Sequence, residues 1–112
     1  KDSSSDNRII NVVNFIRKNI DKNIDIDTLA GLSCLSKDHF IRLFKSEMKT
    51  TPLQYIVKKK IEKAQLLLIT KDLAIKEIAY TLGYDNYSYF IKLFKKQTVL
   101  TPQTYKESNR KH

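Results

Sequence analysis

Glycine and proline are scarce in this 112-residue sequence: each occurs only twice, and tryptophan does not occur at all. Because tight hairpin turns depend on these residues, the sequence predicts no β-strand. The single cysteine, Cys34, cannot form an internal disulfide, which indicates a reducing compartment and a cytoplasmic location. No apolar run approaches the ~18 residues of a membrane span, and no signal peptide is recognisable. These absences argue against a disulfide-rich secreted domain and against a membrane-spanning protein.

Negative charge is also in deficit, with 12 acidic residues against 21 lysines and arginines and a formal net charge of +9. This balance favours an anionic partner, with nucleic acid as the first candidate and an acidic membrane surface as the second. Hydrophobic residues make up 41% of the sequence, which is typical of a folded chain with one or two small cores. The chain starts at Lys1 rather than at a methionine, so residues 1–6 are interpreted as the remnant of a linker in a longer protein.

One stretch of the chain occurs twice, at residues 40–55 (FIRLFKSEMKTTPLQY) and 90–105 (FIKLFKKQTVLTPQTY). At a constant offset of fifty, eight of the sixteen positions are identical, where chance would match about one. The identical pairs are Phe40/Phe90, Ile41/Ile91, Leu43/Leu93, Phe44/Phe94, Lys45/Lys95, Thr51/Thr101, Pro52/Pro102 and Tyr55/Tyr105. The chain is therefore predicted to contain two copies of one helical unit.

The apolar residues recur at helical spacing throughout, and polar caps mark the helix starts. The expected caps are Asp6, Asp25, Ser36, Asn86, and Thr51 with Gln54 in a capping box. The expected inward positions are Ile9, Val12, Val13, Ile16, Ile20, Leu29, Ala30, Leu32, Phe40, Leu43, Phe44, Leu53, Ile56, Ile61, Ala64, Leu67, Leu68, Ile75, Ile78, Ala79, Phe90, Leu93 and Phe94. A long helix should run from Pro52 to about Thr70, with its end at residues 66–69 packed into the second copy.

A short helix, a tight turn and a second helix with a basic outer face form a helix-turn-helix, and the sequence predicts this motif twice. Ala79 and Gly83 have the spacing of the small contact residue and the left-handed turn residue that the motif requires. Cys34 stands at the turn of the first copy, so we expect about 1 kcal/mol of strain or a different shape there. The predicted fold is all-α with about seven helices: a linker remnant at 1–6, helix-turn-helix subdomains at 7–50 and 71–106, a linker helix at 51–70 and a polar tail at 107–112.

The two copies together resemble the AraC/XylS family of bacterial transcription regulators. The matching segments are LA at 29–30, Ser36, FIRLFK at 40–45, TPLQY at 51–55, KIEKAQLLL at 60–68, IKEIAYTLGY at 75–84, SYFIKLFKK at 88–96 and TPQTY at 101–105. The resemblance covers residues 8–106 and implies two recognition helices in successive major grooves of DNA. The family usually has glycine where this chain has Lys49 and Val99, and arginine where it has Lys60, so the resemblance does not extend to the helix-end geometry or to one backbone contact, while the fold is expected to be the same.

The outward faces of the two recognition helices supply the candidate DNA contacts. With Phe40 and Phe44 inward, residues spaced i, i+3, i+4 and i+7 point outward, and they match the positions that face the groove in the family. The predicted base contacts are Asp38, Ile41, Arg42 and Lys45 in the first copy and Tyr87, Ser88, Ile91, Lys92 and Lys95 in the second. The predicted phosphate contacts are Lys37, Lys58, Lys59, Lys60 and Lys96, although residues 58–60 are equally consistent with a solvated helix face.

The aromatic residues and the histidines point to structure rather than chemistry. Phe40, Phe44, Phe90, Phe94, Tyr84, Tyr89 and Tyr105 are interpreted as core residues and not as base-stacking platforms, and His39 as a surface residue. No cluster of histidine and cysteine predicts a metal site. Neither a catalytic constellation nor a glycine-rich phosphate loop is present, so we expect neither an enzyme nor a cofactor.

The sequence therefore predicts the output domain of a transcription regulator that binds specific double-stranded DNA sequences. The resemblance implies an activator that works with RNA polymerase, and we expect a sensing or dimerisation domain before this chain in the natural protein. Two alternatives remain open: a helical adaptor for an acidic protein, and an amphipathic module at an anionic membrane surface. The fragment itself is expected to be monomeric, because no large apolar stripe is left once both cores are filled.

Overall fold

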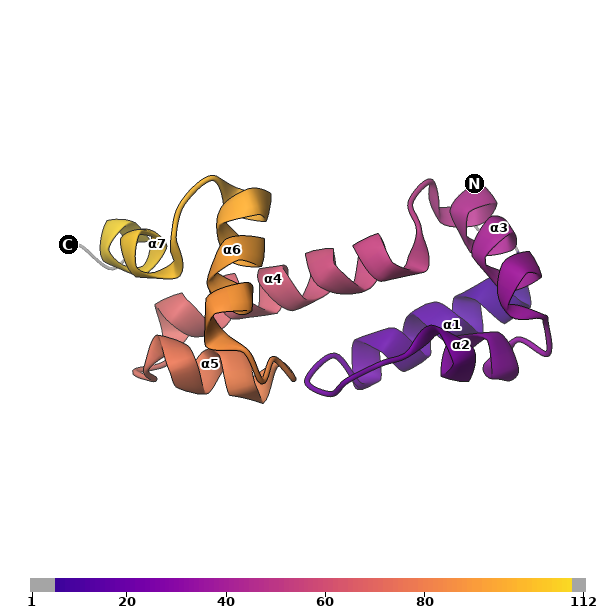
Figure 1. Ribbon diagram of the computed structural model, residues 1–112, viewed down its shortest axis with the longest axis horizontal. Helices are drawn as coiled ribbons and strands as arrows, with labels where there is room; N and C mark the ends of the chain where they lie inside the picture. Colours follow the sequence, from indigo (N-terminus) through magenta and orange to yellow (C-terminus); the bar gives the residue numbers. More distant parts are fainter. Residues whose placement is uncertain (1–5, 110–112) are drawn as a thin grey trace. The chain divides into compact units, whose positions relative to one another are not determined.

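A computed structural model describes residues 6–109, and within them the chain folds into seven helices without a strand (Figure 1). The helices are α1 (Asn7–Lys18), α2 (Ile26–Leu32), α3 (Lys37–Met48), α4 (Pro52–Thr70), α5 (Ile75–Thr81), α6 (Tyr87–Thr98) and α7 (Pro102–Asn109). This confirms the predicted all-α class with two helix-turn-helix motifs, α2–α3 and α5–α6. Residues 1–5 of the predicted linker remnant (1–6) and residues 110–112 of the predicted tail lie outside the described residues. No helix in the described range is long and apolar enough to cross a membrane.

The described residues form two compact units. Unit 1 comprises residues 6–20 and 24–56, and unit 2 comprises residues 21–23 and 57–109. The division falls inside α4, between Ile56 and Val57. Unit 2 thus contains a short segment, Asp21–Asn23, that lies between α1 and α2 in the sequence.

The predicted helix starts are confirmed by hydrogen bonds from backbone amides to the capping side chains. Asp6 accepts from the amide of Arg8 at 2.9 Å, Asp25 from Thr28 at 2.8 Å, Ser36 from His39 at 3.2 Å and Asn86 from Tyr89 at 3.0 Å. At α4, Thr51 Oγ1 accepts from the amide of Gln54 at 3.1 Å, and Gln54 Oε1 accepts from the amide of Thr51 at 3.2 Å. These bonds satisfy backbone donors that have no partner inside the helix, so local sequence defines where the helices begin.

Each unit has its own hydrophobic core, built on the same pair of phenylalanines. In unit 1, Phe40 and Phe44 are fully buried, and the ring of Phe44 lies 5.7 Å from that of Tyr55. The other buried residues there are Ile9, Val12, Ile16, Leu29, Ala30 and Ile56. In unit 2, Phe90 and Phe94 are fully buried with Ile61, Ala64, Leu67, Leu68, Ile78, Ala79 and Leu82, and the ring of Phe94 lies 5.6 Å from that of Tyr105. Burial of each such ring stabilises its unit by about 1.5–3 kcal/mol.

The turn inside each helix-turn-helix has the same left-handed geometry. Gly83 has a φ angle of 88° and Cys34 a φ angle of 58°. After the turn, the amide of Tyr84 donates to the carbonyl of Ala79 at 2.9 Å, and the amide of Leu35 donates to that of Ala30 at 3.1 Å. The turn at Cys34 therefore has the same kind of conformation as the turn at Gly83, and Cys34 is strained because it is a non-glycine residue in the left-handed region.

Left-handed residues also end both recognition helices. Lys49 has a φ angle of 65° and donates its amide to Lys45 at 2.9 Å, while Val99 has a φ angle of 75° and donates to Lys95 at 2.7 Å. The helix ends thus keep a conformation that glycine adopts freely, although neither residue is glycine. The resemblance left the geometry of these helix ends open, and the structure shows left-handed ends that place strain on Lys49 and Val99.

Several residues predicted to be inward are exposed: Leu53 (62%), Leu66 (52%), Leu32 (48%) and Ile69 (38%). In α4 the buried positions are Pro52, Tyr55 and Ile56 at one end and Ile61, Ala64, Leu67 and Leu68 at the other. Because successive residues of a helix are 100° apart, the leucines next to these positions turn toward solvent. The last helix, α7, is eight residues long and extends to Asn109, into the predicted polar tail at 107–112.

Candidate nucleic-acid interface

The outer face of α3 carries the polar residues predicted for the first copy. Burial of Phe40 and Phe44 turns Asp38, Arg42 and Lys45 to solvent, where all three are exposed. Ile41 is half-buried, because part of its side chain packs against the core of unit 1. Arg42 and Lys45 therefore form the accessible basic part of this face, with Asp38 near the helix start.

The outer face of α6 has the same arrangement. Ser88, Lys92 and Lys95 are exposed, while Tyr87 and Ile91 are half-buried against the core of unit 2. Both isoleucines of the predicted set thus contribute to their cores, which is a structural reason for an apolar residue on an otherwise charged face. Each presents only part of its surface to solvent.

Of the lysines predicted to contact phosphates, Lys37, Lys58 and Lys96 are exposed and Lys59 is half-buried. Lys37 Nζ lies 3.9 Å from Asp27 Oδ1, and Lys59 Nζ lies 3.2 Å from Glu62 Oε1. Surface ion pairs of this kind contribute about 0–1 kcal/mol, so they do not prevent either lysine from turning toward another anion.

The phosphate-contact prediction for Lys60 is contradicted by its burial. Only 4% of this residue is exposed, and its ammonium group donates to the carbonyl oxygens of Leu82 at 2.6 Å and Lys22 at 2.7 Å. Burial lowers the pKa of Lys60 to about 8, although the negative charge of Asp21 acts in the opposite direction. The register of α4 explains why this prediction is wrong. Lys60 precedes the buried Ile61 and faces the protein interior, whereas Lys58 is exposed and Lys59 is half-buried.

Sequence reasoning placed Tyr89 in the core, but 53% of it is exposed at the start of α6. Its ring meets that of Tyr84 edge-on at 6.3 Å, and burial raises the pKa of Tyr84 to about 12, with Tyr89 acting in the same direction. The repeat held the signal for this position, because an offset of fifty pairs Tyr89 with His39, which is also exposed. Tyr89 is therefore a further aromatic side chain on the accessible surface of α6.

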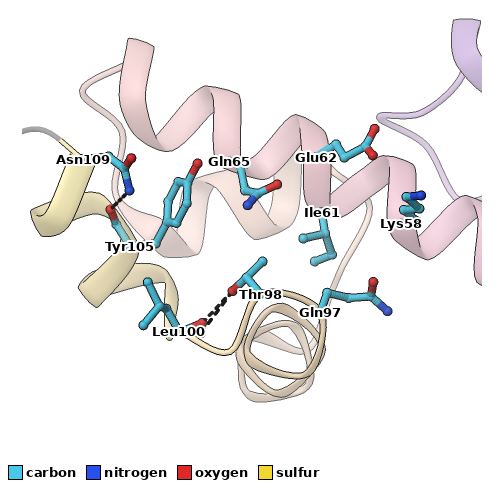
Figure 2. A pocket seen from close by; sticks show the side chains of 9 residues that line it. All are labelled: Lys58, Ile61, Glu62, Gln65, Gln97, Thr98, Leu100, Tyr105 and Asn109. Carbon is cyan, nitrogen blue, oxygen red and sulfur yellow. Dashed lines mark hydrogen bonds between the residues drawn. The ribbon is translucent and has the colours of Figure 1, made fainter.

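A shallow groove of about 340 Å³ lies in unit 2 between α4, the end of α6 and α7 (Figure 2). Ile61, Leu100 and Tyr105 give it apolar walls, and Gln65, Gln97 and Thr98 add uncharged polar groups. Lys58 is the one predicted contact residue among those that line it. The groove is therefore separate from the outer face of α6. Among residues 6–109, no group of three or more His, Cys, Asp or Glu side chains is arranged to hold a metal ion.

Two helix-turn-helix motifs, each with a basic outer face on its second helix, define a DNA-binding module. A family model described as a helix-turn-helix domain matches residues 29–108. The chain is 34% identical over 107 residues to the xylose operon regulatory protein of Escherichia coli K12, covering 96% of this chain and 27% of that protein. It is 31% identical over 102 residues to an uncharacterised HTH-type transcriptional regulator, YdeC, of Bacillus subtilis, covering 91% of this chain and 35% of that protein.

Among solved structures, the DNA-binding domain of the transcriptional factor AdpA, crystallised with a target DNA, superposes with a TM-score of 0.88 at 27% identity. This match covers 92% of the present chain and 93% of that one. The chain belongs to the AraC/XylS family of transcription regulators and is a DNA-binding domain of that family. The family and the fold are those of DNA-binding regulators and not of enzymes. The chain spans about a third or less of the length of the curated relatives described above.

Proposed function

We propose that this chain binds specific double-stranded DNA sequences by placing α3 and α6 in successive major grooves, as the output domain of a bacterial transcription activator. The observation that carries the proposal is the repetition of one exposed pattern on two helices. Arg42 and Lys45 of α3 recur as Lys92 and Lys95 of α6, at the same distance from the buried phenylalanines. Two such faces on one chain suit a duplex whose grooves recur every ~34 Å.

The proposed contacts divide into base-reading and phosphate-binding groups. Arg42 can donate two parallel hydrogen bonds to a guanine edge, Lys92 can donate to the same edge with less rigidity, and Asp38 can accept from a cytosine amino group. The accessible parts of Ile41 and Ile91 suit thymine methyl groups. The remaining proposed base contacts are Lys45, Tyr87, Ser88 and Lys95, and the proposed phosphate contacts are Lys37, Lys58, Lys59 and Lys96.

The regulatory context is proposed from the relatives. The E. coli relative is named as the regulatory protein of the xylose operon, and the AdpA domain was crystallised with a target DNA. By analogy, this chain acts in the cytoplasm, recruits RNA polymerase and receives its signal from a separate sensing or dimerisation domain. The isolated chain is a monomer, and sedimentation at tens of micromolar tests this, because a stable dimer would contradict it.

The base-reading role is tested by comparing Arg42→Ala with Lys58→Ala, which removes an exposed lysine from α4. The probes are a duplex selected by the unmodified chain from a randomised pool and a random duplex of the same length. Arg42→Ala should cost about 1–3 kcal/mol on the selected duplex and flatten the base preference at one position. Lys58→Ala should weaken binding to both duplexes alike and reduce the salt slope by about one.

Equal losses on both duplexes for Arg42→Ala would show that Arg42 does not read bases. If the unmodified chain selects no duplex from the randomised pool but binds vesicles of anionic lipid, the DNA-binding proposal itself fails.

The use of two grooves is tested by inserting base pairs between the two halves of the selected duplex. If both helices engage one face of the DNA, an insertion of about five base pairs should move the second half to the opposite face and abolish its contribution. Equal affinity for every spacing would contradict simultaneous binding by α3 and α6.

A further inference from the structure

Lys60 is a positively charged residue in the interior of unit 2, where burial of a charge is unfavourable unless partners satisfy it. Its partners include two backbone carbonyls, those of Leu82 and Lys22, at 2.6 and 2.7 Å. The ring of Tyr84 is a third, with its centroid 5.8 Å from Nζ. These groups come from two segments that are far apart in the sequence, residues 82–84 and residues 21–23, and both segments meet at the ammonium group.

Two of these partners belong to the turn that leads into α6. Leu82 is the C-cap of α5, Gly83 adopts the left-handed conformation, and the ring of Tyr84 packs 5.5 Å from that of Phe90 on α6. Lys22, whose carbonyl accepts from Lys60, belongs to the segment Asp21–Asn23, which lies against the same turn. A Cβ atom added at Gly83 would stand 3.0 Å from Asn23 Oδ1 and 3.2 Å from the carbonyl carbon of Lys22. The ammonium group of Lys60 therefore joins the turn to this segment.

Unit 1 shows that helix-turn-helix packing does not require a buried cation at this position. Ile9, Val12 and Ile16 of α1 have the same i, i+3, i+7 spacing as the buried Ile61, Ala64 and Leu68 of α4. The residue before Ile9 is Arg8, whose side chain is 48% exposed and pairs with Asp6 at 2.9 Å. Because the fold is built without this interaction in unit 1, the buried ammonium group is a special feature of unit 2.

A buried charge is a poor source of stability, since a well-packed apolar side chain is often as favourable at the same place. A charge with fixed partners does, however, allow one arrangement of those partners and disfavours others. We propose that Lys60 is a positioning residue for DNA recognition: it holds the α5–α6 turn against residues Asp21–Asn23 and so fixes the direction of α6. The proposal rests on the groove-binding role proposed for α6 above.

The test compares Lys60→Met, which keeps the length and apolar stem of the side chain but removes its charge, with Lys60→Arg. Lys60→Met should keep its helical circular dichroism and its unfolding midpoint, yet lose affinity for the selected duplex by about tenfold, the loss that one or two mismatched base pairs would cause. Base preference should weaken only in the half of the duplex that α6 reads. Lys60→Arg should bind within about threefold of the unmodified chain, because a guanidinium fork can still donate to two carbonyls.

Arg8→Met is the matched control, since it removes the corresponding cation of unit 1, and it should leave affinity unchanged. If Lys60→Met folds and binds the selected duplex with unchanged base preference, the positioning role is wrong. If Lys60→Met does not fold, Lys60→Gln is measured by the same criteria. If neither variant folds, Lys60 is a structural residue only, and the proposal fails.

A second measurement needs no DNA and separates this proposal from the groove-binding proposal. The amide of Tyr84 donates to the carbonyl of Ala79 across the turn. In the free protein, Lys60→Met should speed hydrogen exchange at this amide, while exchange at the equivalent amide of Leu35 in unit 1 should not change. Unchanged exchange at Tyr84 would overturn the positioning role even if the chain binds DNA as proposed.

Discussion

Substitution of Val99 tests how much strain this chain carries at its helix ends. It is a β-branched residue with a φ angle of 75°, and 78% of it is exposed. A left-handed conformation costs a non-glycine residue roughly 1–2 kcal/mol, and β-branching makes such a conformation rarer still. Because the side chain is mostly in solvent, its removal sacrifices little packing. Val99→Gly should therefore relieve the strain at almost no cost in the folded state.

The unfolded state reduces the gain, since glycine makes the unfolded chain more flexible by about 0.4–1 kcal/mol. The net stabilisation expected for Val99→Gly is thus about 0.5–1 kcal/mol, which corresponds to a rise in melting temperature of roughly 2–8 °C for a unit of this size. Urea unfolding followed by circular dichroism measures the free energy directly. Lys49→Gly is the matched variant, with a φ angle of 65° on an unbranched residue, and it should stabilise unit 1 by less.

Val99→Ala completes the comparison, because alanine keeps the left-handed penalty without the β-branch. It should fall between valine and glycine. A destabilised or unchanged Val99→Gly protein with a normal spectrum would refute the reasoning, since the left-handed residue would then carry no measurable strain.

Three further predictions concern stability. Gly31→Ala should stabilise α2 by about 0.5–1 kcal/mol, because the added Cβ meets nothing within 4 Å. Gly83→Ala should instead destabilise unit 2, because Gly83 has a φ angle of 88° and lies close to Asn23; equal effects of the two substitutions in urea unfolding would contradict this. Phe94→Ala should cost about 3–5 kcal/mol and largely unfold unit 2 at 25 °C, so a loss below about 1 kcal/mol would show that the core is not centred on this ring. The pKa of Lys60 in the folded protein, about 8, lies below the ordinary lysine value of 10.5, so the unfolded chain binds more protons between these two pH values. This group should therefore make stability rise with pH in that window, and Lys60→Met should remove the rise; parallel pH profiles for the two proteins would contradict the shift.

Local patterns in the sequence were sufficient to predict the fold. The caps at Asp25, Ser36 and Asn86 each act on a backbone amide three residues away or closer, so their effect is independent of distant parts of the chain. The burial of Phe40 and Phe90 follows from helical spacing, and their repetition at a fixed offset identified the double helix-turn-helix. The exposure of Arg42 and Lys92 follows from the same register, so the candidate interface could also be located from sequence.

Contacts in the folded chain settled where the side chains of Lys60, Tyr89 and Leu66 lie, although helix register and the repeat carried a signal for the first two. Lys60 belongs to a run of three lysines, and the register of α4 turns it toward the protein. The partners of its ammonium group, among them the carbonyls of Lys22 and Leu82, 38 and 22 residues away, come together only in the folded chain. An aromatic or apolar side chain such as Tyr89 or Leu66 is compatible with both core and surface, and the neighbouring elements determine which of the two it joins. Sequence periodicity thus determined which helices form and which face of each is buried, because these depend on residues within one or two turns. Contacts between distant segments decide whether a side chain at the edge of a helix face is buried or exposed, and such contacts exist only in the folded chain.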